Sequence, residues 1–524
     1  MTHPILIDGQ WQASAGSETF TATNPADGRS LDGDYPVSNR ADIEAAAGAA
    51  GRAFEQCRDW PGEKFADFLD AYAAKIDAHG EALASKAHEE TGLPVSPRLL
   101  DVEVPRTSNQ MRAGAEAART YSWATPRIDT AAGIRSMLGP VGPVAIFGPN
   151  NFPLAINPIA GNDFVAAVAA GCPVIAKGHP LHPGTTRLFG ELAQQAAEET
   201  AMPAGFVQLI YHMSNDDGVA LLERPEIAAA AFTGSRAGGL ALKAVADKHG
   251  KPFYAEMSAI NPVFVLPGAL AERDDLVDEF FGSCTLGAGQ FCTNPGLIVL
   301  MKGEASDAFV AAAGEKFADA GPMTTLGQGV TDHYEKSLAT LKAAGAEVVA
   351  RGSEHDGPGA RAVPTLLKTT ADTLLKNDDL LTEAFGPSSL VVMCESLDEA
   401  VAVARAQEGN LTGCLYTAKD GRDDGAYDAI AGVLRTKVGR LLNDKMPTGV
   451  AVSRAMNHGG PFPASGHPGF SSMGLPQSVT RFGALQSYDA VRPHRLPAVL
   501  QDANPGGVWR DIDGTWTQDE VALA

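Results

Sequence analysis

A series of short apolar runs alternating with helical patterns, between residues 142 and 256, most strongly restricts the fold of this chain. The runs are bounded by Gly or Pro, and the segments between them have the spacing of amphipathic helices. The predicted strands are residues 142–148, 173–177, 206–211, 227–232 and 252–256, and the predicted helices are residues 163–170, 185–199, 216–223 and 236–249. This alternation predicts a doubly wound parallel sheet of the α/β class, whose ligands bind beyond the carboxyl ends of the strands.

A second alternating block predicts a second parallel sheet. We expect its strands at residues 261–266, 297–301 and 389–393 and its helices at 306–320 and 397–407. A loop-rich stretch is expected from residue 320 to about residue 390. An edge strand in residues 4–11 and Ala-rich helices at 42–57, 62–91 and 99–119 are expected before the first block. The Gly-, Pro- and Ser-rich residues after Pro447 predict loops, and the polar tail from Asp502 is expected to pack on the surface.

Charge and composition disfavour several classes of partner. The chain has 524 residues, enough for two or three domains, and 63 acidic against 41 basic residues give a net charge of −22. Such a balance argues against nucleic acid and anionic membranes, although a few arginines could still bind a small anion. No signal-peptide pattern or membrane-spanning apolar run is visible. The six cysteines form no CxxC pair and no metal-type spacing occurs, so we expect reduced thiols in a cytoplasmic protein without a metal site.

Cys292 lies in a segment that suits a reactive thiol. It follows Gly289 by three residues, at the end of a helical stretch rich in small residues. Glycines allow a tight turn and a close approach to a ligand, which would place the thiol on a loop beside a cavity. A thiol there becomes a nucleophile if a neighbouring group takes its proton. The alternative is a buried cysteine that only fills space, which is the commoner role and the one we assign to Cys284.

Other polar residues stand at the ends of predicted strands or just beyond them. The candidates are Asn151, Lys177, Ser235, Glu256 and Glu383. A carboxylate there can act as a general base, and an asparagine amide can donate to an oxyanion. A lysine could donate to ribose hydroxyls, and a serine at a helix start suits a phosphate. Each also has an ordinary explanation as a turn, a helix cap or a surface residue, and neither GxGxxG nor a P-loop is present.

In their order along the chain, these residues resemble the aldehyde dehydrogenase superfamily over essentially the whole length. The matching stretches are Pro149-Asn-Asn-Phe-Pro-Leu154, Cys172-Pro-Val-Ile-Ala-Lys177, Phe232-Thr-Gly-Ser235, Glu256 before Asn261-Pro262, Gly289-Gln-Phe-Cys292 and Glu383-Ala-Phe-Gly-Pro387. Each stretch is short, but six in the same order are specific. The resemblance implies two doubly wound parallel-sheet domains and a small oligomerisation segment.

The resemblance also implies a role for each matching residue. Cys292 would be the nucleophile and Glu256 the base that activates water, with Asn151 and the backbone N–H of Cys292 stabilising the oxyanion. Hydride transfer to a nicotinamide would leave a thioester, and its hydrolysis would release a carboxylic acid. Because branches that pass the acyl group to coenzyme A generally lack this base, Glu256 favours hydrolysis. The implied cofactor-binding residues are Pro149, Lys177, His179, Gly234, Ser235, Glu383 and Phe385.

Departures from the superfamily pattern bear on the choice of cofactor. Pro180 occupies a position that often carries a glutamate in NAD-preferring relatives. The loss of this carboxylate removes repulsion against a 2′-phosphate, and His179 could favour one. We therefore expect NADP, with NAD as the alternative. The paired glycines usual after the base are replaced by Ser258-Ala259, and the Gly-Lys that usually follows them by Ile260.

The C-terminal run resembles one branch of the superfamily, through Pro447–Val452, His458–Ala464, Arg481-Phe482 and Arg492-Pro493. That branch contains the 2,5-dioxovalerate (α-ketoglutarate semialdehyde) dehydrogenases, whose substrate we favour, and an NADP-dependent fatty aldehyde dehydrogenase. A short anionic substrate needs arginines or hydroxyl donors, whereas a long aldehyde needs an apolar tunnel. The candidate arginines are Arg106, Arg112, Arg454 and Arg481. A catalytically idle binding protein and a cofactor-free esterase are the alternatives of other classes.

The superfamily's architecture implies three parts. The coenzyme-binding domain would comprise residues 1–120 and 142–258, and the catalytic domain residues 259–445. Residues 121–141 and 478–524 would form the oligomerisation segment and tail. We therefore expect a homodimer or homotetramer that acts on a small aldehyde.

Overall fold

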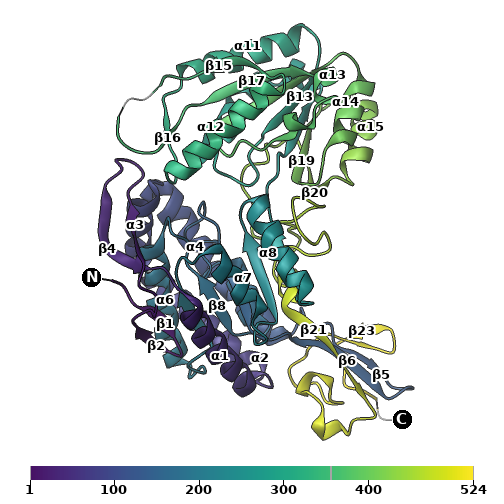
Figure 1. Ribbon diagram of the computed structural model, residues 1–524. Helices are drawn as coiled ribbons and strands as arrows, with labels where there is room; N and C mark the ends of the chain where they lie inside the picture. Colours follow the sequence, from purple (N-terminus) through teal and green to yellow (C-terminus); the bar gives the residue numbers. More distant parts are fainter. Residues whose placement is uncertain (1, 355–356, 523–524) are drawn as a thin grey trace.

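The computed structural model describes residues 2–354 and 357–522, which form two lobes and a projecting arm (Figure 1). Each lobe is built around a seven-stranded sheet, and the arm around a five-stranded sheet. Among the described residues, no helix is long and apolar enough to cross a membrane. The chain therefore has the α/β class predicted from its alternating pattern.

The first sheet has the strand order β11-β10-β7-β8-β9-β1-β2. Its parallel strands are β7 (Val144–Phe147), β8 (Val174–Lys177), β9 (Val207–Ile210), β10 (Ala229–Thr233) and β11 (Phe253–Glu256), and β1 (Ile5–Ile7) and β2 (Gln10–Gln12) add an antiparallel edge. Every residue of β7 and β9 is buried. Burial of successive side chains means that both faces of the sheet are covered, which explains the unbroken apolar runs of the sequence.

Helices surround this sheet (Figure 1). They are α1 (Arg40–Cys57), α2 (Gly62–Ala78), α3 (Gly80–Thr91), α4 (Val104–Thr120), α5 (Asn162–Ala169), α6 (Pro183–Glu199), α7 (Asn215–Glu223) and α8 (Arg236–Lys248). The single helix predicted over residues 62–91 is wrong, because the chain turns at His79 between α2 and α3. A Cβ on Gly80 would lie 3.0 Å from Val104 Cγ1, so the glycine lets α3 begin against the start of α4.

A π-helical segment, η1 (Val95–Glu103), precedes α4. The predicted helix over residues 99–119 therefore begins in π-helical backbone and becomes α-helical only at Val104. A separate two-stranded ribbon, β3 (Thr19–Thr23) and β4 (Ser30–Pro36), lies near the N-terminus.

The second sheet has the order β15-β17-β18-β13-β12-β19-β20. Its parallel strands are β12 (Pro262–Val265), β13 (Leu297–Met301), β17 (Thr365–Thr370), β18 (Ser388–Cys394), β19 (Asn410–Tyr416) and β20 (Val438–Asn443), and β15 (Glu347–Arg351) is antiparallel to β17. Its helices are α9 (Pro267–Glu272), α10 (Leu276–Thr285), α11 (Glu304–Asp319), α12 (Gln328–Ala343), α13 (Ala371–Leu374), α14 (Leu397–Ala406) and α15 (Asp424–Leu434).

The loop-rich stretch predicted between residue 320 and about residue 390 is wrong. It contains α12, the edge strand β15, the inner strand β17 and a short ribbon of β14 (Met323–Thr324) with β16 (Arg361–Ala362). In α12 only Tyr334, Leu338 and Leu341 form an apolar stripe on an otherwise polar helix. A stripe this narrow gives a weak periodic signal, so the helix is hard to recognise without its packing partner.

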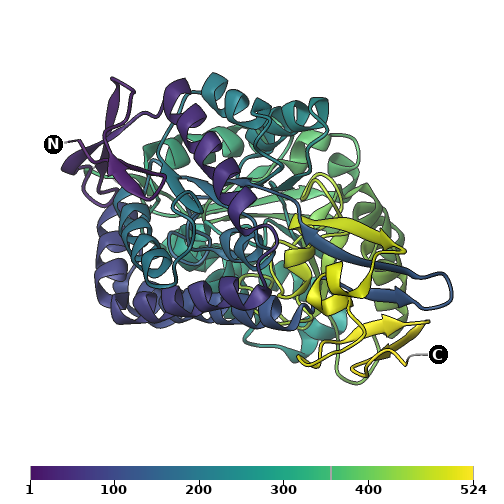
Figure 2. The same ribbon diagram turned by 90° about the horizontal axis from the view of Figure 1, so that it is seen from below.

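The arm sheet has the order β21-β6-β5-β22-β23, and it projects from the body in both views (Figures 1 and 2). The strands are β5 (Arg127–Asp129), β6 (Ile134–Pro140), β21 (Gly483–Asp489), β22 (Arg510–Ile512) and β23 (Thr515–Thr517). The tail thus adds two strands to the arm through β5, and its last two residues, 523 and 524, lie outside the described part. Fully buried Arg510 holds the tail together by donating to the carbonyls of Gln501 and Asp519.

Between β20 and Gln477 the described chain forms no helix or strand, apart from one bridge between Glu256 and Ser465. This confirms the loops predicted after Pro447. The domain boundaries implied by the resemblance remain a prediction.

Candidate active site

Cys292 lies on a loop between the end of α10 and β13. Three successive residues before it, Gly287, Ala288 and Gly289, have positive φ angles of 56°, 56° and 68°. A Cβ on Gly289 would lie 2.1 Å from the carbonyl oxygen of Gly386, so only glycine fits this close approach. The side chain of Asn261 fixes the loop by donating from Nδ2 to the Cys292 carbonyl at 2.9 Å.

The two cysteines of this segment have different surroundings. Cys292 is half-buried, whereas Cys284 is fully buried in α10 within the core of the second lobe. The filling role predicted for Cys284 is therefore confirmed.

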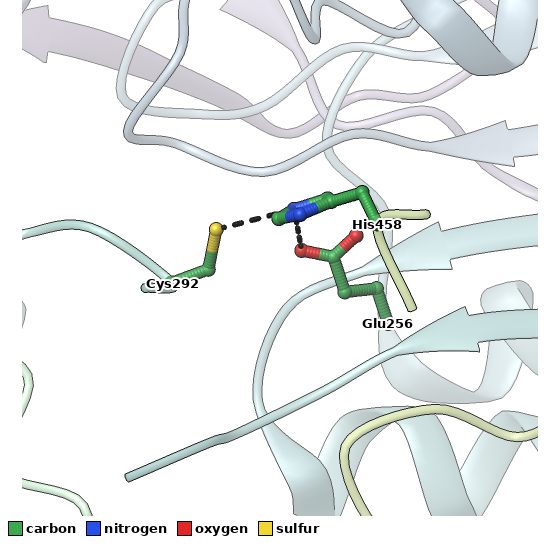
Figure 3. Close-up of side chains that lie close together, drawn as sticks. All are labelled: Glu256, Cys292 and His458. Atoms are coloured by element: carbon green, nitrogen blue, oxygen red, sulfur yellow. Dashed lines mark hydrogen bonds and ion pairs between the residues drawn. The ribbon is translucent and has the colours of Figure 1, made fainter. Parts of the chain in front are cut away.

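Glu256 and His458 lie beside the thiol of Cys292 (Figure 3). His458 Nε2 is 3.4 Å from Cys292 Sγ and 2.8 Å from Glu256 Oε1. Glu256 ends β11, whereas His458 belongs to the long loop after β20, so distant segments bring the three together. His458 is almost fully buried, and its Nδ1 has no hydrogen-bond partner among the described residues. The imidazole can therefore exchange protons with this site only through Nε2.

The surroundings of these groups set their protonation. Burial, together with the charge of Glu256, raises the pKa of Cys292 well above that of an ordinary thiol. Burial opposes ionisation of Glu256 too, but the charge of His458 and the hydrogen bonds from His458, Ser472 and Cys292 hold the pKa of Glu256 below its usual value. At neutral pH the resting site thus holds a thiol next to a carboxylate, and the thiol needs a neighbouring acceptor for its proton.

A buried network of hydrogen bonds through Ser472 fixes the position of the Glu256 carboxylate. Ser472 Oγ donates to Glu256 Oε2 at 2.8 Å, and the Ser472 carbonyl accepts from Asn162 Nδ2 at 2.5 Å and from Arg481 Nη2 at 3.4 Å. Arg481 also pairs with Asp163 at 2.8 Å, and both side chains are buried. Arg481, a substrate candidate from the sequence, therefore has its charge matched by Asp163 and supports the base.

Asn151 is held from two sides. Its Nδ2 donates to the Gln290 carbonyl at 2.9 Å, and its own carbonyl accepts from Arg98 Nη2 at 3.1 Å. Arg98 pairs with buried Glu103, whose Oε2 accepts the backbone N–H groups of residues 154 and 155 at 3.0 Å. Because an amide nitrogen carries two hydrogens, the second hydrogen of Asn151 Nδ2 remains available to a ligand.

A cavity of about 340 Å³ opens beside Cys292 and Glu256. Six of the seven cofactor residues implied by the resemblance line it, together with Asn151: Pro149, His179, Gly234, Ser235, Glu383 and Phe385. Ser235 caps α8 through a hydrogen bond from Gly238 N to its Oγ, which leaves the start of a 13-residue helix at the cavity wall. Lys177, at the end of β8, is not among the lining residues.

Two ionisable groups near this cavity lack a charged partner among the described residues. Burial raises the pKa of Glu383 to about 7, although hydrogen bonds from Ser258 and Ala259 oppose the shift. Burial lowers the pKa of Lys177 to about 8. The Glu383 carboxylate and the Lys177 ammonium can make hydrogen bonds with the uncharged ribose hydroxyls of a nicotinamide dinucleotide. The N-terminus of α8 can bind its pyrophosphate.

His179 differs from what a phosphate-binding residue would show. Burial and the nearby His182 and Lys177 hold its pKa well below the usual value, so the imidazole is neutral. Its Nδ1 accepts a hydrogen bond from Leu181 N at 3.2 Å, which leaves Nε2–H as the donor.

Of the other arginines proposed from the sequence, Arg106 alone acts on the thiol. Its Nη2 donates to Met473 Sδ at 3.0 Å, and its guanidinium interacts electrostatically with Cys292 and Glu256. Arg112 is exposed and pairs with Asp77. Arg454 is exposed and makes no hydrogen bond or ion pair with the described residues.

His458 is the residue that sequence reasoning missed. Its only signal in the sequence is membership of the branch motif His458–Ala464, and no local spacing links a histidine in a Gly- and Pro-rich loop to a cysteine 166 positions earlier. The ligand-type atoms of Glu256, Cys292 and His458 lie within 4.8 Å of one another, so the expected absence of a metal site remains a prediction.

Comparison with known proteins decides the family. The aldehyde dehydrogenase family matches residues 11–450 of this chain. The chain belongs to that family. It is 39% identical to alpha-ketoglutaric semialdehyde dehydrogenase 2 of Azospirillum brasilense, over 98% of this chain and 99% of that one. It is 36% identical to the alpha-ketoglutaric semialdehyde dehydrogenase of Acinetobacter baylyi, over 98% of each chain.

The fold agrees with this assignment. The NAD⁺ complex of the Bacillus cereus aldehyde dehydrogenase matches with a TM-score of 0.80 and 21% identity, over 93% of this chain and 96% of that one. The resemblance and the α/β aldehyde dehydrogenase fold expected from the sequence motifs are therefore confirmed.

Proposed function

We propose that this chain oxidises an aldehyde to a carboxylic acid through a thioester on Cys292, with 2,5-dioxovalerate as its substrate and 2-oxoglutarate as its product. The observation that carries the proposal is the placement of the Cys292 thiol beside His458, Glu256 and the cofactor cavity (Figure 3). A nucleophile, a proton acceptor and a base thus lie within reach of one carbonyl carbon.

The first step is attack of Cys292 Sγ on the aldehyde carbon. The thiol proton passes to the Glu256–His458 pair, whose carboxylate makes a hydrogen bond with the thiol and whose imidazole Nε2 lies 3.4 Å from Sγ and 2.8 Å from Glu256 Oε1. The carbonyl oxygen becomes an oxyanion, which accepts hydrogen bonds from Asn151 Nδ2 and the backbone N–H of Cys292. One well-placed donor of this kind stabilises the transition state by about 3 kcal/mol.

The second step is loss of hydride from the tetrahedral adduct, which leaves the thioester. A nicotinamide cofactor bound in the cavity would supply the hydride acceptor. Glu383 and Lys177 would hold its ribose hydroxyls, Ser235 and Gly234 its pyrophosphate, and Phe385 and Pro149 would bound the nicotinamide end.

The third step is hydrolysis of the thioester. Glu256 accepts a proton from a water molecule, which attacks the acyl carbon, and the thiolate leaves. Ser472 and His458 orient the carboxylate for this step through the contacts at 2.8 Å. A carboxylate with a lowered pKa is ionised at neutral pH and so is ready to accept the proton.

Two observations support 2,5-dioxovalerate as the substrate. Two relatives that match along nearly the whole chain are named alpha-ketoglutaric semialdehyde dehydrogenases. Arg106 also lies near Glu103 and Cys292 but forms no ion pair with a described residue, so its guanidinium can still bind an anionic substrate.

One observation favours the alternative, a medium- or long-chain aldehyde. An apolar cluster close to the loop of Cys292 would suit an acyl chain. Its members are Phe152, Ala155, Ile156, Phe291 and Met473, with Val450 packed against them.

Rates on three aldehydes test the proposal. We expect the highest kcat/KM on 2,5-dioxovalerate, and lower values on hexanal and decanal. A higher kcat/KM on decanal would replace the dioxovalerate assignment by the fatty aldehyde one. No cofactor-dependent absorbance change with any aldehyde would reject the dehydrogenase itself.

For the cofactor we infer NADP, with NAD as the weaker alternative. Support comes from Pro180, which puts no carboxylate where a 2′-phosphate would lie, whereas neutral His179 adds a hydrogen-bond donor but no charge. The ratio of kcat/KM for NADP to that for NAD decides the question, and a ratio below 1 would reverse the inference.

A homodimer or homotetramer is inferred from the family and supported by the arm. β21 and β20 are edge strands of their sheets, and Leu485 on β21 is 72% exposed. Such an unpaired edge offers free N–H and C=O groups with which a strand of another chain can pair. Light scattering on the purified protein measures the assembly directly, and a monomer at micromolar concentration would contradict it.

A further inference from the structure

Arg440 is a cation without a partner. It lies in β20, and its Nε and Nη2 atoms are buried. Its side chain makes no hydrogen bond or ion pair with any described residue. A guanidinium removed from water normally gains an acidic or carbonyl partner, because desolvation of an unmatched charge is costly. Arg440 as a whole is half-buried, and its two buried nitrogen atoms without a hydrogen bond therefore point to an anion that binds the guanidinium.

The register of the second sheet places Arg440 beside Thr412, which is linked through Asn261 to the backbone of Cys292. Arg440 is paired with Thr412 on the neighbouring strand β19, so their side chains share one face of the sheet. Thr412 Oγ1 donates to Asn261 Oδ1 at 2.9 Å. Asn261 Nδ2 in turn donates to the carbonyl of Cys292 at 2.9 Å. Arg440 thus ends a row of side chains that leads to the nucleophile.

Electrostatics agree with this placement. Burial lowers the pKa of Arg440, and the charges of Cys292 and Glu256 oppose that shift. Burial likewise lowers the pKa of Arg106, and the charges of Glu103 and Cys292 oppose this shift. Two cations from different lobes of the molecule therefore act on the same sulfur.

Arg106 has only a weak partner of its own. Its Nε is buried without a hydrogen bond, and its Nη2 contacts a thioether, which is a poor acceptor. Neither Arg106 nor Arg440 lines the cofactor cavity. Both therefore lie away from the pyrophosphate, which the cofactor would bring as an anion.

The acidic groups nearby have other partners or lie elsewhere. Glu256 is held by His458 and Ser472, and Glu103 is paired with Arg98. Glu383 lines the cofactor cavity, where it contacts Ser258 and Ala259. The charges of Glu103 and Glu256 reach these arginines from a distance, but no described carboxylate forms an ion pair with Arg106 or Arg440.

We propose that Arg440, acting with Arg106, binds the carboxylate of the substrate and makes the enzyme selective for aldehydes that carry an acid group. The proposal rests on the oxidation of 2,5-dioxovalerate proposed above. A carboxylate has two oxygens that accept hydrogen bonds, so it can take donors from both guanidinium groups at once. Arg440 is then a specificity-determining residue that the sequence motifs did not indicate.

The other role for two such cations would be to stabilise the thiolate of Cys292. The two roles differ in what they do to an uncharged substrate. A thiolate-stabilising arginine speeds the reaction of every aldehyde, whereas a carboxylate-binding arginine speeds only that of an acidic one.

The test compares 2,5-dioxovalerate with pentanal, an uncharged aldehyde of the same chain length. In Arg440→Met we expect kcat/KM on 2,5-dioxovalerate to fall about 100-fold, mainly through KM, and kcat/KM on pentanal to stay within about 3-fold. Arg440→Lys keeps the charge and should recover part of the loss. Arg106→Met should repeat the pattern. Arg29→Met, at an exposed arginine between β3 and β4, is the matched control and should change the rate on neither substrate.

Protection of Cys292 from iodoacetamide gives a readout without turnover. Glutarate, a dicarboxylate of similar length, should slow alkylation of the wild-type protein about 10-fold more than that of Arg440→Met at equal concentration. Circular dichroism and the melting temperature confirm that each variant is folded. Where Arg440→Met does not fold, Arg440→Lys and Arg106→Met give the same comparison.

The outcomes separate the two proposals. A wild-type protein that fails to oxidise 2,5-dioxovalerate refutes the proposed substrate, and glutarate protection then tests the anion site alone. Equal losses on both aldehydes would assign Arg440 to the thiolate and overturn the inference. Unchanged selectivity together with unchanged glutarate protection would overturn it as well.

Discussion

The two sides of Cys292 are built in different ways. The side that faces the cofactor cavity comes from the ends of parallel strands and the helix starts that follow them, as with Ser235 at the start of α8 and Glu256 at the end of β11. The other side contains His458 and Ser472, from a long loop without helix or strand, and Arg440 from an edge strand. Regular elements therefore place the cofactor residues, whereas an irregular segment places the groups that move protons and hold the base.

The largest effect expected from this difference is that of His458→Gln. Glutamine retains a polar side chain but cannot carry the thiol proton, so we expect kcat to fall about 10³-fold. Alkylation of Cys292 at pH 7 should slow as well, because the acceptor next to Sγ is lost. Steady-state rates and iodoacetamide labelling measure the two effects.

The matched control for this variant is His494→Gln, at an exposed histidine that follows β21 in the chain. It should keep both the wild-type rate and the labelling. If His458→Gln kept kcat within 3-fold, Glu256 would take the thiol proton directly and the loop would have no part in proton transfer.

Ser472→Ala should have an intermediate effect. It removes the 2.8 Å hydrogen bond to Glu256 Oε2, which raises the pKa of Glu256 and loosens the carboxylate. Loss of a hydrogen bond to a charged group is expected to slow hydrolysis about 10- to 100-fold. Because attack and hydride loss precede hydrolysis, a burst of reduced cofactor should appear before the steady state. Stopped-flow absorbance at 340 nm detects it.

The control for this variant is Ser453→Ala, at an exposed position of the same loop. Absence of a burst in Ser472→Ala, with kcat unchanged, would show that the loop does not govern the base.

The same difference explains what could be predicted from the sequence. Strands β7 to β11 carry unbroken apolar runs because both faces are covered, and the cofactor residues follow directly after them. The glycines before Cys292 are also readable, since the turn needs positive φ angles. His458 and Arg440 could not be assigned in this way. Their roles depend on which segments meet in space, and a Gly- and Pro-rich loop has no periodicity that encodes its partners.

Arg481 is the opposite case, a residue that the sequence suggests for substrate binding but that the fold uses for support. As a residue type it suited an anionic substrate, but in the fold Asp163 takes up its charge and it supports Ser472 instead. α12 was missed because its apolar stripe is narrow, although Tyr334 is fully buried. In each case the packing partner, rather than the residue itself, decides the role.

The smallest effect is expected on the cofactor side, in the pH dependence of binding. The pKa of Glu383 is raised to about 7, so the carboxylate becomes ionised, and able to accept ribose hydroxyls, as the pH rises through 7. The pKa of Lys177 is lowered to about 8, so its charge is lost as the pH rises through 8. Cofactor affinity should therefore increase about 10-fold from pH 6 to between pH 7 and 8, and then decline.

Glu383→Gln separates the two limbs of this profile. It should remove the rise below pH 7 and leave the decline above pH 8, because Lys177 is untouched. Calorimetric titration with NADP between pH 6 and 9 measures both limbs without turnover. His458→Gln should keep the wild-type profile, since His458 does not line the cofactor cavity. A profile that changed in His458→Gln and persisted in Glu383→Gln would mean that the two sides of Cys292 are not independent, and that the loop also controls how the cofactor is held.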